Sequence, residues 1–68
     1  MKIFSIRLQE LRKERKLTQQ QMAEFLGIKR GSYLCYERDE CDPNLTNVVK
    51  LADFFGVTAD YLLGRTEI

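Results

Sequence analysis

The chain has 68 residues, of which 44% are hydrophobic and 31% are charged, and its formal net charge is +1. This length fits one domain, residues 1–68, near the lower limit of what folds unaided. No apolar run is long enough to span a bilayer, and the start of the chain lacks the apolar block of a signal peptide. We therefore expect a cytoplasmic protein with no membrane partner.

The charges are unevenly distributed along the chain. Residues 1–38 contain nine Lys or Arg and four Asp or Glu, a net charge of +5, whereas residues 39–68 have a net charge of −4. The distribution of charge matters more for partner choice than the total. The first half therefore carries the only plausible contact surface for phosphates.

The residue types that most enzymes and metal sites need are missing or badly spaced. The chain has no histidine, and five residues separate Cys35 from Cys41, which matches no common zinc or redox motif. We expect both cysteines to be reduced thiols with packing or surface roles. No glycine-rich phosphate loop or nucleophile–base pair is recognisable. The sequence thus predicts no catalysis, metal, cofactor or small-molecule ligand.

The first predicted helix runs from about residue 5 to 15. Phe4, Leu8 and Leu11 recur at positions i, i+4 and i+7 and form one apolar stripe. The charge run over residues 12–16 indicates a solvated face of this helix.

A second helix is predicted over about 19–26 by the signals at its two ends. Thr18 is a good N-cap, Gln21 completes a capping-box pattern, and Gly27 is placed to end the helix in a left-handed conformation. The apolar residues expected to be buried on it are Met22, Phe25 and Leu26. A third helix over about 30–37 follows after only three or four residues, which is the length of a helix-turn-helix connection.

Two further helices complete the prediction. After a polar stretch over residues 38–44, apolar residues recur at helical spacing up to Gly56: Leu45, Val48, Leu51, Ala52 and Phe55. Thr58 caps a short fifth helix that carries Tyr61 and Leu62 and ends at Gly64. No segment alternates over the length of a strand, so the predicted fold class is all-α, a compact five-helix bundle.

The third predicted helix has two distinct sides. At about 100° per residue, Tyr33, Tyr36 and Glu37 share the side that suits packing on the first two helices, with Ser32 at its margin. The opposite side, which we expect to face outward, carries Arg30, Gly31, Leu34, Cys35 and Arg38. A short helix presented outward after a tight turn can enter a DNA major groove with its first residues nearest the bases. Arg30 can then donate two hydrogen bonds to guanine, and Lys29 can reach a base or a phosphate.

The motifs resemble those of the Cro/repressor (Xre) helix-turn-helix family from about Ile6 to Gly64, without gaps. The segments that carry the resemblance are residues 17–28 (LTQQQMAEFLGI), Tyr33, residues 36–38 (YER), residues 43–45 (PNL), residues 51–52 (LA) and residues 56–64 (GVTADYLLG). The resemblance implies the five-helix fold of this family, a helix-turn-helix over about 18–38, a recognition helix over about 29–37, and binding to double-stranded DNA.

The resemblance also implies roles for individual positions. Thr18 and Gln19 match positions that grip phosphate at a helix N-terminus. Ser32 matches a position that often holds phosphate, and Arg38 one that contacts the DNA backbone. The positions that match base readers are Lys29, Arg30, Gly31, Leu34 and Cys35. In addition, Arg12 and Glu37 match a buried ion pair that ties the first helix to the third and orients it.

The chain departs from the family pattern at several of these positions. Lys29 stands where relatives place a Ser or Thr N-cap, so we expect the third helix to begin less firmly. Gly31, Leu34 and Cys35 offer no charged or amide group, although Leu34 can contact a thymine methyl and Gly31 can allow close backbone approach. The loop over residues 39–42 is acidic. These departures predict modest affinity or a narrow base code, and they leave room for a surface that binds protein.

Together these observations predict a transcription regulator, more specifically a repressor that binds an inverted repeat as a homodimer. Two recognition helices would then enter successive major grooves about 34 Å apart. We expect the dimer surface in residues 61–68, where Leu63 and Ile68 lack an obvious internal partner. The alternative is a protein-interaction module, such as an antitoxin-like or anti-repressor partner, for which Leu34 and Cys35 would be contacts.

Overall fold

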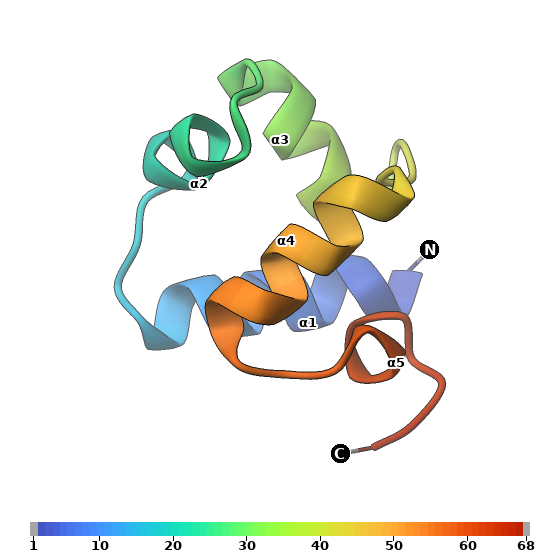
Figure 1. Cartoon of the computed structure of the whole chain (residues 1–68). Coiled ribbons are helices and arrows are strands. Elements are labelled where there is room, and N and C mark those ends of the chain that lie inside the picture. Colours follow the sequence, from blue (N-terminus) through green and yellow to red (C-terminus); the bar gives the residue numbers. More distant parts are fainter. Residues whose placement is uncertain (1, 68) are drawn as a thin grey trace.

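The computed structural model describes residues 2–67, which form five helices and no strand (Figure 1). The helices are α1 (Lys2–Glu14), α2 (Gln19–Leu26), α3 (Arg30–Glu37), α4 (Leu45–Phe55) and α5 (Ala59–Leu62). The predicted all-α, five-helix fold is confirmed. In Figure 1, α2 and α3 lie together on the side of the molecule opposite to α5 and the C-terminal end. None of the helices within residues 2–67 has the length and apolar character that a membrane crossing requires.

The helix ends follow from side chains that satisfy backbone groups. Thr18 accepts a hydrogen bond from the backbone N–H of Gln21, whose side chain accepts one from the Thr18 N–H, so the predicted capping box is present. Asn44 caps α4 and Thr58 caps α5 in the same way, through their side-chain oxygens. These caps explain why the predicted bounds of α2 and α4 agree with the structure. By contrast, α1 begins three residues earlier than predicted, because nothing in residues 2–4 opposes a helix.

One buried cluster joins all five helices. Its members are Phe4, Leu8, Met22, Ala23, Leu26, Tyr33, Tyr36, Leu51, Ala52, Phe55 and Leu62. One residue that we predicted to be buried is not. The Phe25 side chain is 42% exposed and stacks on the ring of Phe54, with 4.6 Å between the ring centroids. Leu45 is 76% exposed because it occupies the first turn of α4, on the side that faces away from the core.

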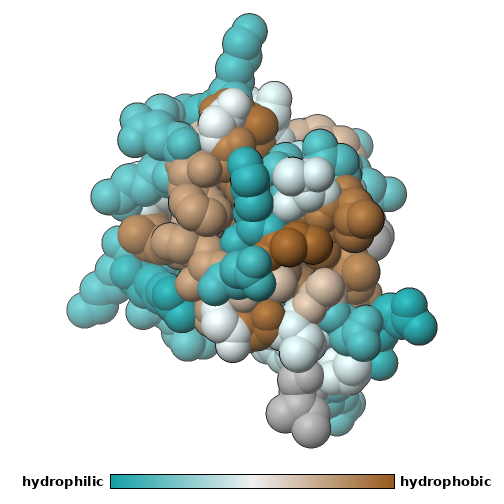
Figure 2. Space-filling view, viewed as in Figure 1, coloured by the Kyte–Doolittle hydropathy of each residue, from teal (hydrophilic) through white to brown (hydrophobic). Residues whose placement is uncertain are grey.

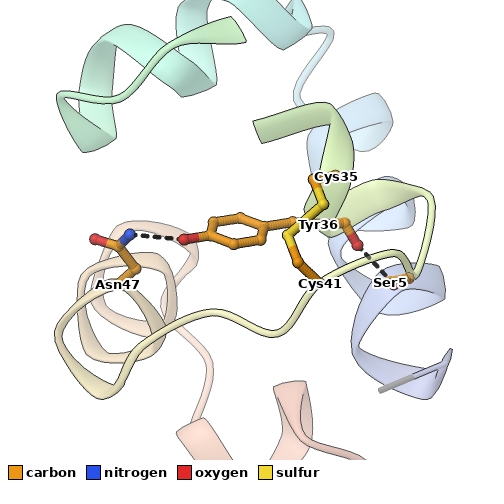
Figure 3. The surroundings of a disulfide bond; sticks show 5 residues. All are labelled: Ser5, Cys35, Tyr36, Cys41 and Asn47. Atoms are coloured by element: carbon orange, nitrogen blue, oxygen red, sulfur yellow. Dashed lines mark hydrogen bonds between the residues drawn. A yellow bond between two sulfur atoms is a disulfide. The ribbon is translucent and has the colours of Figure 1, made fainter. Parts of the chain in front are cut away.

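Two buried polar contacts fix Tyr36 between α1 and α4 (Figure 3). Ser5 donates a hydrogen bond to the backbone carbonyl of Tyr36 at 2.6 Å. The amide nitrogen of Asn47 donates to the Tyr36 hydroxyl at 2.9 Å. Ser5 and Asn47 are both buried, so each contact replaces water that these polar groups lose on folding.

Two arginines, Arg7 of α1 and Arg15 directly after its end, hold the C-terminal half of the chain by its carbonyl groups. Arg15 donates to the carbonyls of Phe54 and Phe55, which end α4, at 3.0 and 2.9 Å. Arg7 donates to the carbonyls of Tyr61 and Thr66, and its guanidinium lies 4.2 Å from the centroid of the Tyr61 ring. Cations near the carbonyl end of a helix also interact favourably with its dipole. These side chains are therefore committed to the fold.

The chain leaves α5 through Gly64, which has a φ of +80° and lies against Ile3. A Cβ atom at this position would lie 2.7 Å from the Cγ2 atom of Ile3. Gly56 has a similar φ, +68°, but a Cβ there would meet nothing within 4 Å. An L-residue would therefore be strained at either position, but only at Gly64 would its Cβ also collide with Ile3.

We predict that Gly64→Ala lowers the free energy of unfolding by about 1 kcal/mol more than Gly56→Ala does. Both variants carry the cost of a left-handed alanine, roughly 1–2 kcal/mol, and only Gly64→Ala adds overpacking against Ile3. Urea denaturation followed by circular dichroism measures both variants. Equal losses in the two would show that Ile3 moves aside without cost.

Candidate nucleic-acid interface

A turn of three residues connects α2 to α3. Gly27 adopts a φ of +69°, and its N–H reaches the carbonyls of Ala23 and Glu24 at the end of α2. The N–H of Ile28 also bonds to the carbonyl of Ala23, at 3.0 Å. Glycine adopts this left-handed conformation without the steric cost of a Cβ. The turn therefore redirects the chain at once, so that α3 follows α2 with the connection length of a helix-turn-helix unit.

The predicted orientation of α3 is confirmed at most positions. Tyr33, Tyr36 and Glu37 are buried. The exposed residues at and around α3 are Lys29, Arg30, Gly31, Ser32 and Arg38. Leu34 and Cys35, which we expected to face outward, are only half-exposed. The outward surface is thus formed mainly by the residues at the N-terminal end of α3.

The N-terminal end of α3 begins without a side-chain cap. Lys29 occupies the N-cap position with extended backbone angles and makes no side-chain cap hydrogen bond. We expected this weaker helix start because Lys29 stands where relatives have a Ser or Thr N-cap. The first backbone N–H groups of α3, from Arg30 to Ser32, therefore stay open to an external acceptor. Gly31 lies in open space, since a Cβ there would meet nothing within 4 Å.

The start of α2 presents a second set of donors. The capping box uses the backbone N–H groups of Thr18 and Gln21. The N–H groups of Gln19 and Gln20 in the same first turn are then the two that remain for an acceptor from outside, such as a phosphate oxygen. The side-chain amide of Gln19 donates to the Glu37 carboxylate at 3.2 Å. An amide has two N–H donors, so one remains for an external partner.

The carboxylate of Glu37 joins the first three helices. Arg12 of α1 binds it through two nitrogens, at 2.6 Å to Oε2 and 3.1 Å to Oε1, so the ion pair implied by the resemblance is present. The Tyr33 hydroxyl, one turn earlier on α3, donates to Oε2, and Gln19 donates to Oε1 from α2. Arg12 also reaches the carbonyl of Leu17 at 2.9 Å. We refer to Arg12, Gln19, Tyr33 and Glu37 as the Glu37 network.

The Glu37 network changes the acidities of its members. Burial alone would raise the pKa of Glu37, but hydrogen bonds from Arg12, Tyr33 and Gln19 outweigh it and hold this pKa below its ordinary value. The hydrogen bond to Glu37 raises the pKa of Arg12. Burial and the same carboxylate raise the pKa of Tyr33, so its hydroxyl remains a donor. Arg12 and Glu37 are therefore both charged at neutral pH.

Two sets of basic side chains differ in how available they are to a partner. Arg7, Arg12 and Arg15 are bound to carbonyl or carboxylate oxygens within the fold. Lys29, Arg30 and Arg38 are exposed, and none of them forms an ion pair with another residue in the range 2–67. The positive charge available at the helix-turn-helix unit therefore comes from the residues at the two ends of α3.

The expectation of two reduced thiols is wrong for this structure. Cys35, in the last turn of α3, forms a disulfide with Cys41 in the following loop, and their Cα atoms are 5.5 Å apart. The chain turns back after α3 because Asp39 adopts a left-handed φ of +58° and the Glu40 N–H bonds to the Cys35 carbonyl. In this state the Cys35 sulfur is not a free thiol that reads a base.

Two features of the site were not predicted from the residues. Tyr33 was assigned only to the core, although its spacing of four residues from Glu37 places both on one face of a helix. That spacing was a usable signal. The pairing of the cysteines had no comparable signal, since it depends on the left-handed turn at Asp39. Neither a pocket nor a group of three or more candidate metal ligands is found in the range 2–67.

The chain belongs to the helix-turn-helix domain family. A family model described as a helix-turn-helix domain matches residues 6–68, which is most of the chain. The names of its relatives agree with the resemblance to the Cro/repressor type that the motifs carry. No solved structure matched significantly.

Its curated relatives are named as transcriptional regulators. The HTH-type transcriptional regulator YobD of Bacillus subtilis is 46% identical over 65 residues, which are 96% of this chain and 58% of that protein. The cryptic phage CTXphi transcriptional repressor RstR of Vibrio cholerae is 38% identical over 96% of this chain and 59% of its own length. The HTH-type transcriptional activator BcrR of Enterococcus faecalis is 37% identical over 96% of this chain and 32% of its own. The chain thus spans three-fifths or less of the length of these relatives.

We predict that Glu37→Gln lowers the free energy of unfolding by about 3 kcal/mol near neutral pH, because it leaves Arg12 without its counter-charge in a partly buried position. The pKa of Glu37 is lowered in the folded state. Its stabilisation is therefore complete above the unfolded value, about 4.3, and is lost as the pH falls through the range below it.

The difference between the wild type and Glu37→Gln should accordingly shrink as the pH is lowered below about 4, since the wild-type carboxyl is then protonated too. Urea denaturation at several pH values measures this difference. Glu10→Gln, at an exposed position of α1, is the matched control and should change stability little at any pH. A loss at Glu37→Gln that did not depend on pH would mean that the carboxylate charge is not what stabilises the fold.

Proposed function

We propose that this chain is the sequence-specific DNA-binding part of a transcriptional repressor and that α3 enters the major groove. The main support for the proposal is the way in which α3 is exposed on the surface. Its aromatic side is buried, while its N-terminal end exposes Lys29, Arg30 and open backbone N–H groups directly after a tight turn. This geometry suits a recognition helix. The relatives named as transcriptional regulators add support, one of them a repressor and another an activator.

In this proposal the bases are read by the first residues of α3. Arg30 is exposed and without an ion-pair partner in the described chain, so its guanidinium is available to donate two hydrogen bonds to a guanine. Lys29 reaches a neighbouring base or phosphate. Gly31 allows close approach of the backbone because no side chain intervenes. The half-exposed Leu34 contacts a thymine methyl.

The phosphates are held from both ends of the helix-turn-helix unit. The first turn of α2 offers the Thr18 hydroxyl and the free N–H groups that begin with Gln19, and such N-termini bind anions well. Ser32 and Arg38 are exposed on α3 and just after it. The hydrogen bond from Gln19 to Glu37 positions this side chain before DNA arrives, which reduces the entropy lost on binding.

A homodimer on an inverted repeat is the assembly that we propose. The tail over residues 61–68 is a weaker candidate for the dimer surface than the sequence indicated, because Leu63 packs against the core. Ile68, the other residue of that prediction, lies outside the described residues. Figure 2 shows apolar side chains gathered on the face that α4 presents in Figure 1. Leu45 and Val49, one turn apart on α4, are 76% and 45% exposed and are the better candidates.

Selection of bound sequences from a random double-stranded DNA pool, at two salt concentrations, tests the proposed function. We expect enrichment of an inverted repeat whose half-sites lie about one helical turn apart, with affinity that falls steeply with salt as counterions are released. A pool that stayed flat at both salt concentrations would contradict DNA recognition. The protein-interaction alternative would then be favoured, with Leu34 and Cys35 as the first contacts to test.

Replacing Arg30 tests the orientation of α3 on DNA. Arg30→Ala should cost roughly 1–3 kcal/mol of binding to the selected sequence and relax the base preference at one position of each half-site. The exposed Lys50 of α4 provides the control, and Lys50→Ala should change binding slightly and equally for all sequences. Fluorescence anisotropy with the selected and scrambled duplexes measures both. An unchanged base preference in Arg30→Ala would show that another face of α3 meets the DNA.

A further inference from the structure

The disulfide between Cys35 and Cys41 closes a short loop at the end of the candidate recognition helix. The Cα separation of 5.5 Å is typical of bridged cysteines. Cys35 and Cys41 are both partly exposed, and Cys41 also packs against the core. Because neither residue is fully buried, we expect a small thiol to reach the bond from solvent. The protein therefore has a disulfide that is accessible to exchange beside the surface that we propose for DNA.

The helices on either side of this loop are held independently of the disulfide. Figure 3 shows the bond next to Tyr36, whose carbonyl is bound by Ser5 and whose hydroxyl is bound by Asn47. Asn44 caps the start of α4 with its side chain. Opening the disulfide thus leaves the anchors of α3 and α4 in place. The part that gains freedom is the loop over residues 38–43.

The loop carries the charges that most affect a nearby phosphate. It begins with Arg38, one of the exposed cations of the site, and continues with Asp39, Glu40 and Asp42. The disulfide fixes Cys41, and with it the end of the loop that carries these three acidic residues, against α3. Negative charges fixed there oppose the approach of a phosphate and offset the attraction of Arg38. A released loop can turn its carboxylates away when DNA approaches.

We propose that Cys35 and Cys41 are a reversible redox site that controls DNA binding, with the disulfide form binding more weakly than the dithiol form. This inference rests on the proposed function, since it acts through phosphates beside Arg38. The reductant is a low-molecular-weight thiol such as glutathione, which keeps most intracellular cysteines reduced. The oxidant is the corresponding disulfide.

The exchange takes place in two balanced steps. The thiolate of one glutathione attacks a sulfur of the Cys35–Cys41 bond, forms a mixed disulfide and releases the other cysteine as a thiolate, which takes up a proton. A second glutathione attacks the mixed disulfide, frees the first cysteine and leaves as oxidised glutathione. Two electrons and two protons pass from two glutathione molecules to the protein. Oxidised glutathione reverses both steps.

The test measures the redox state and DNA binding on the same samples. The protein is equilibrated in buffers with different ratios of reduced to oxidised glutathione, and maleimide labelling with mass spectrometry counts the free thiols. Circular dichroism reports whether the helices persist. Anisotropy then gives the affinity for the selected duplex. We expect the dithiol form, still helical, to bind about fivefold more tightly, which is the size expected from a few exposed charges.

Two variants separate this control from a general effect on folding. Cys41→Ser removes the bond and keeps Cys35, so in reducing buffers it should bind like the dithiol form. Glu40→Gln keeps both cysteines and removes one acidic group of the loop, so it should narrow the difference between the two forms. Equal affinities of the oxidised and reduced wild type, or tighter binding by the oxidised form, would overturn the proposed control alone. If neither form bound any duplex, the proposed function would fail together with it.

Discussion

The carboxylate of Glu37 is the point on which the arrangement of the helix-turn-helix unit depends. One buried acidic group accepts hydrogen bonds from Arg12 on α1, Gln19 on α2 and Tyr33 on α3. A buried charge is costly unless its partners are complete, and here all three donors are in place. The network therefore sets the angle between α2 and α3 in a domain too small to rely on a large apolar core.

This use of charge inside the fold reduces the positive charge that is available to a partner. Arg7 and Arg12 of α1, and Arg15 just after it, are bound to carbonyls and to Glu37, so they contribute packing and hydrogen bonds rather than contacts with a partner. The exposed cations of the helix-turn-helix unit flank α3, with Lys29 and Arg30 at one end and Arg38 at the other. A small number of well-placed charges is enough to read base edges, although it gives less sequence-independent attraction than a basic surface.

The residues that hold α3 in the fold differ from those on its outward surface. Tyr33, Tyr36 and Glu37 are held by the core, by Ser5 and Asn47, and by the Glu37 network. The outward positions make none of these contacts, so changes there affect recognition without disturbing the fold. This separation agrees with relatives that are 37–46% identical and are named variously as regulator, repressor and activator.

The sequence alone determined where α2 and α4 begin and end, because caps such as Thr18 and left-handed glycines such as Gly27 act over four or five residues. It also determined which side of α3 is buried, through the spacing of Tyr33, Tyr36 and Glu37. Only the tertiary structure decided how distant segments meet. It left Phe25 and Leu45 exposed, tied Gln19 to Glu37 and brought Cys41 against Cys35. Local patterns record backbone and side-chain preferences within a turn or two, whereas these contacts depend on the angles between whole helices and on one left-handed residue in a loop.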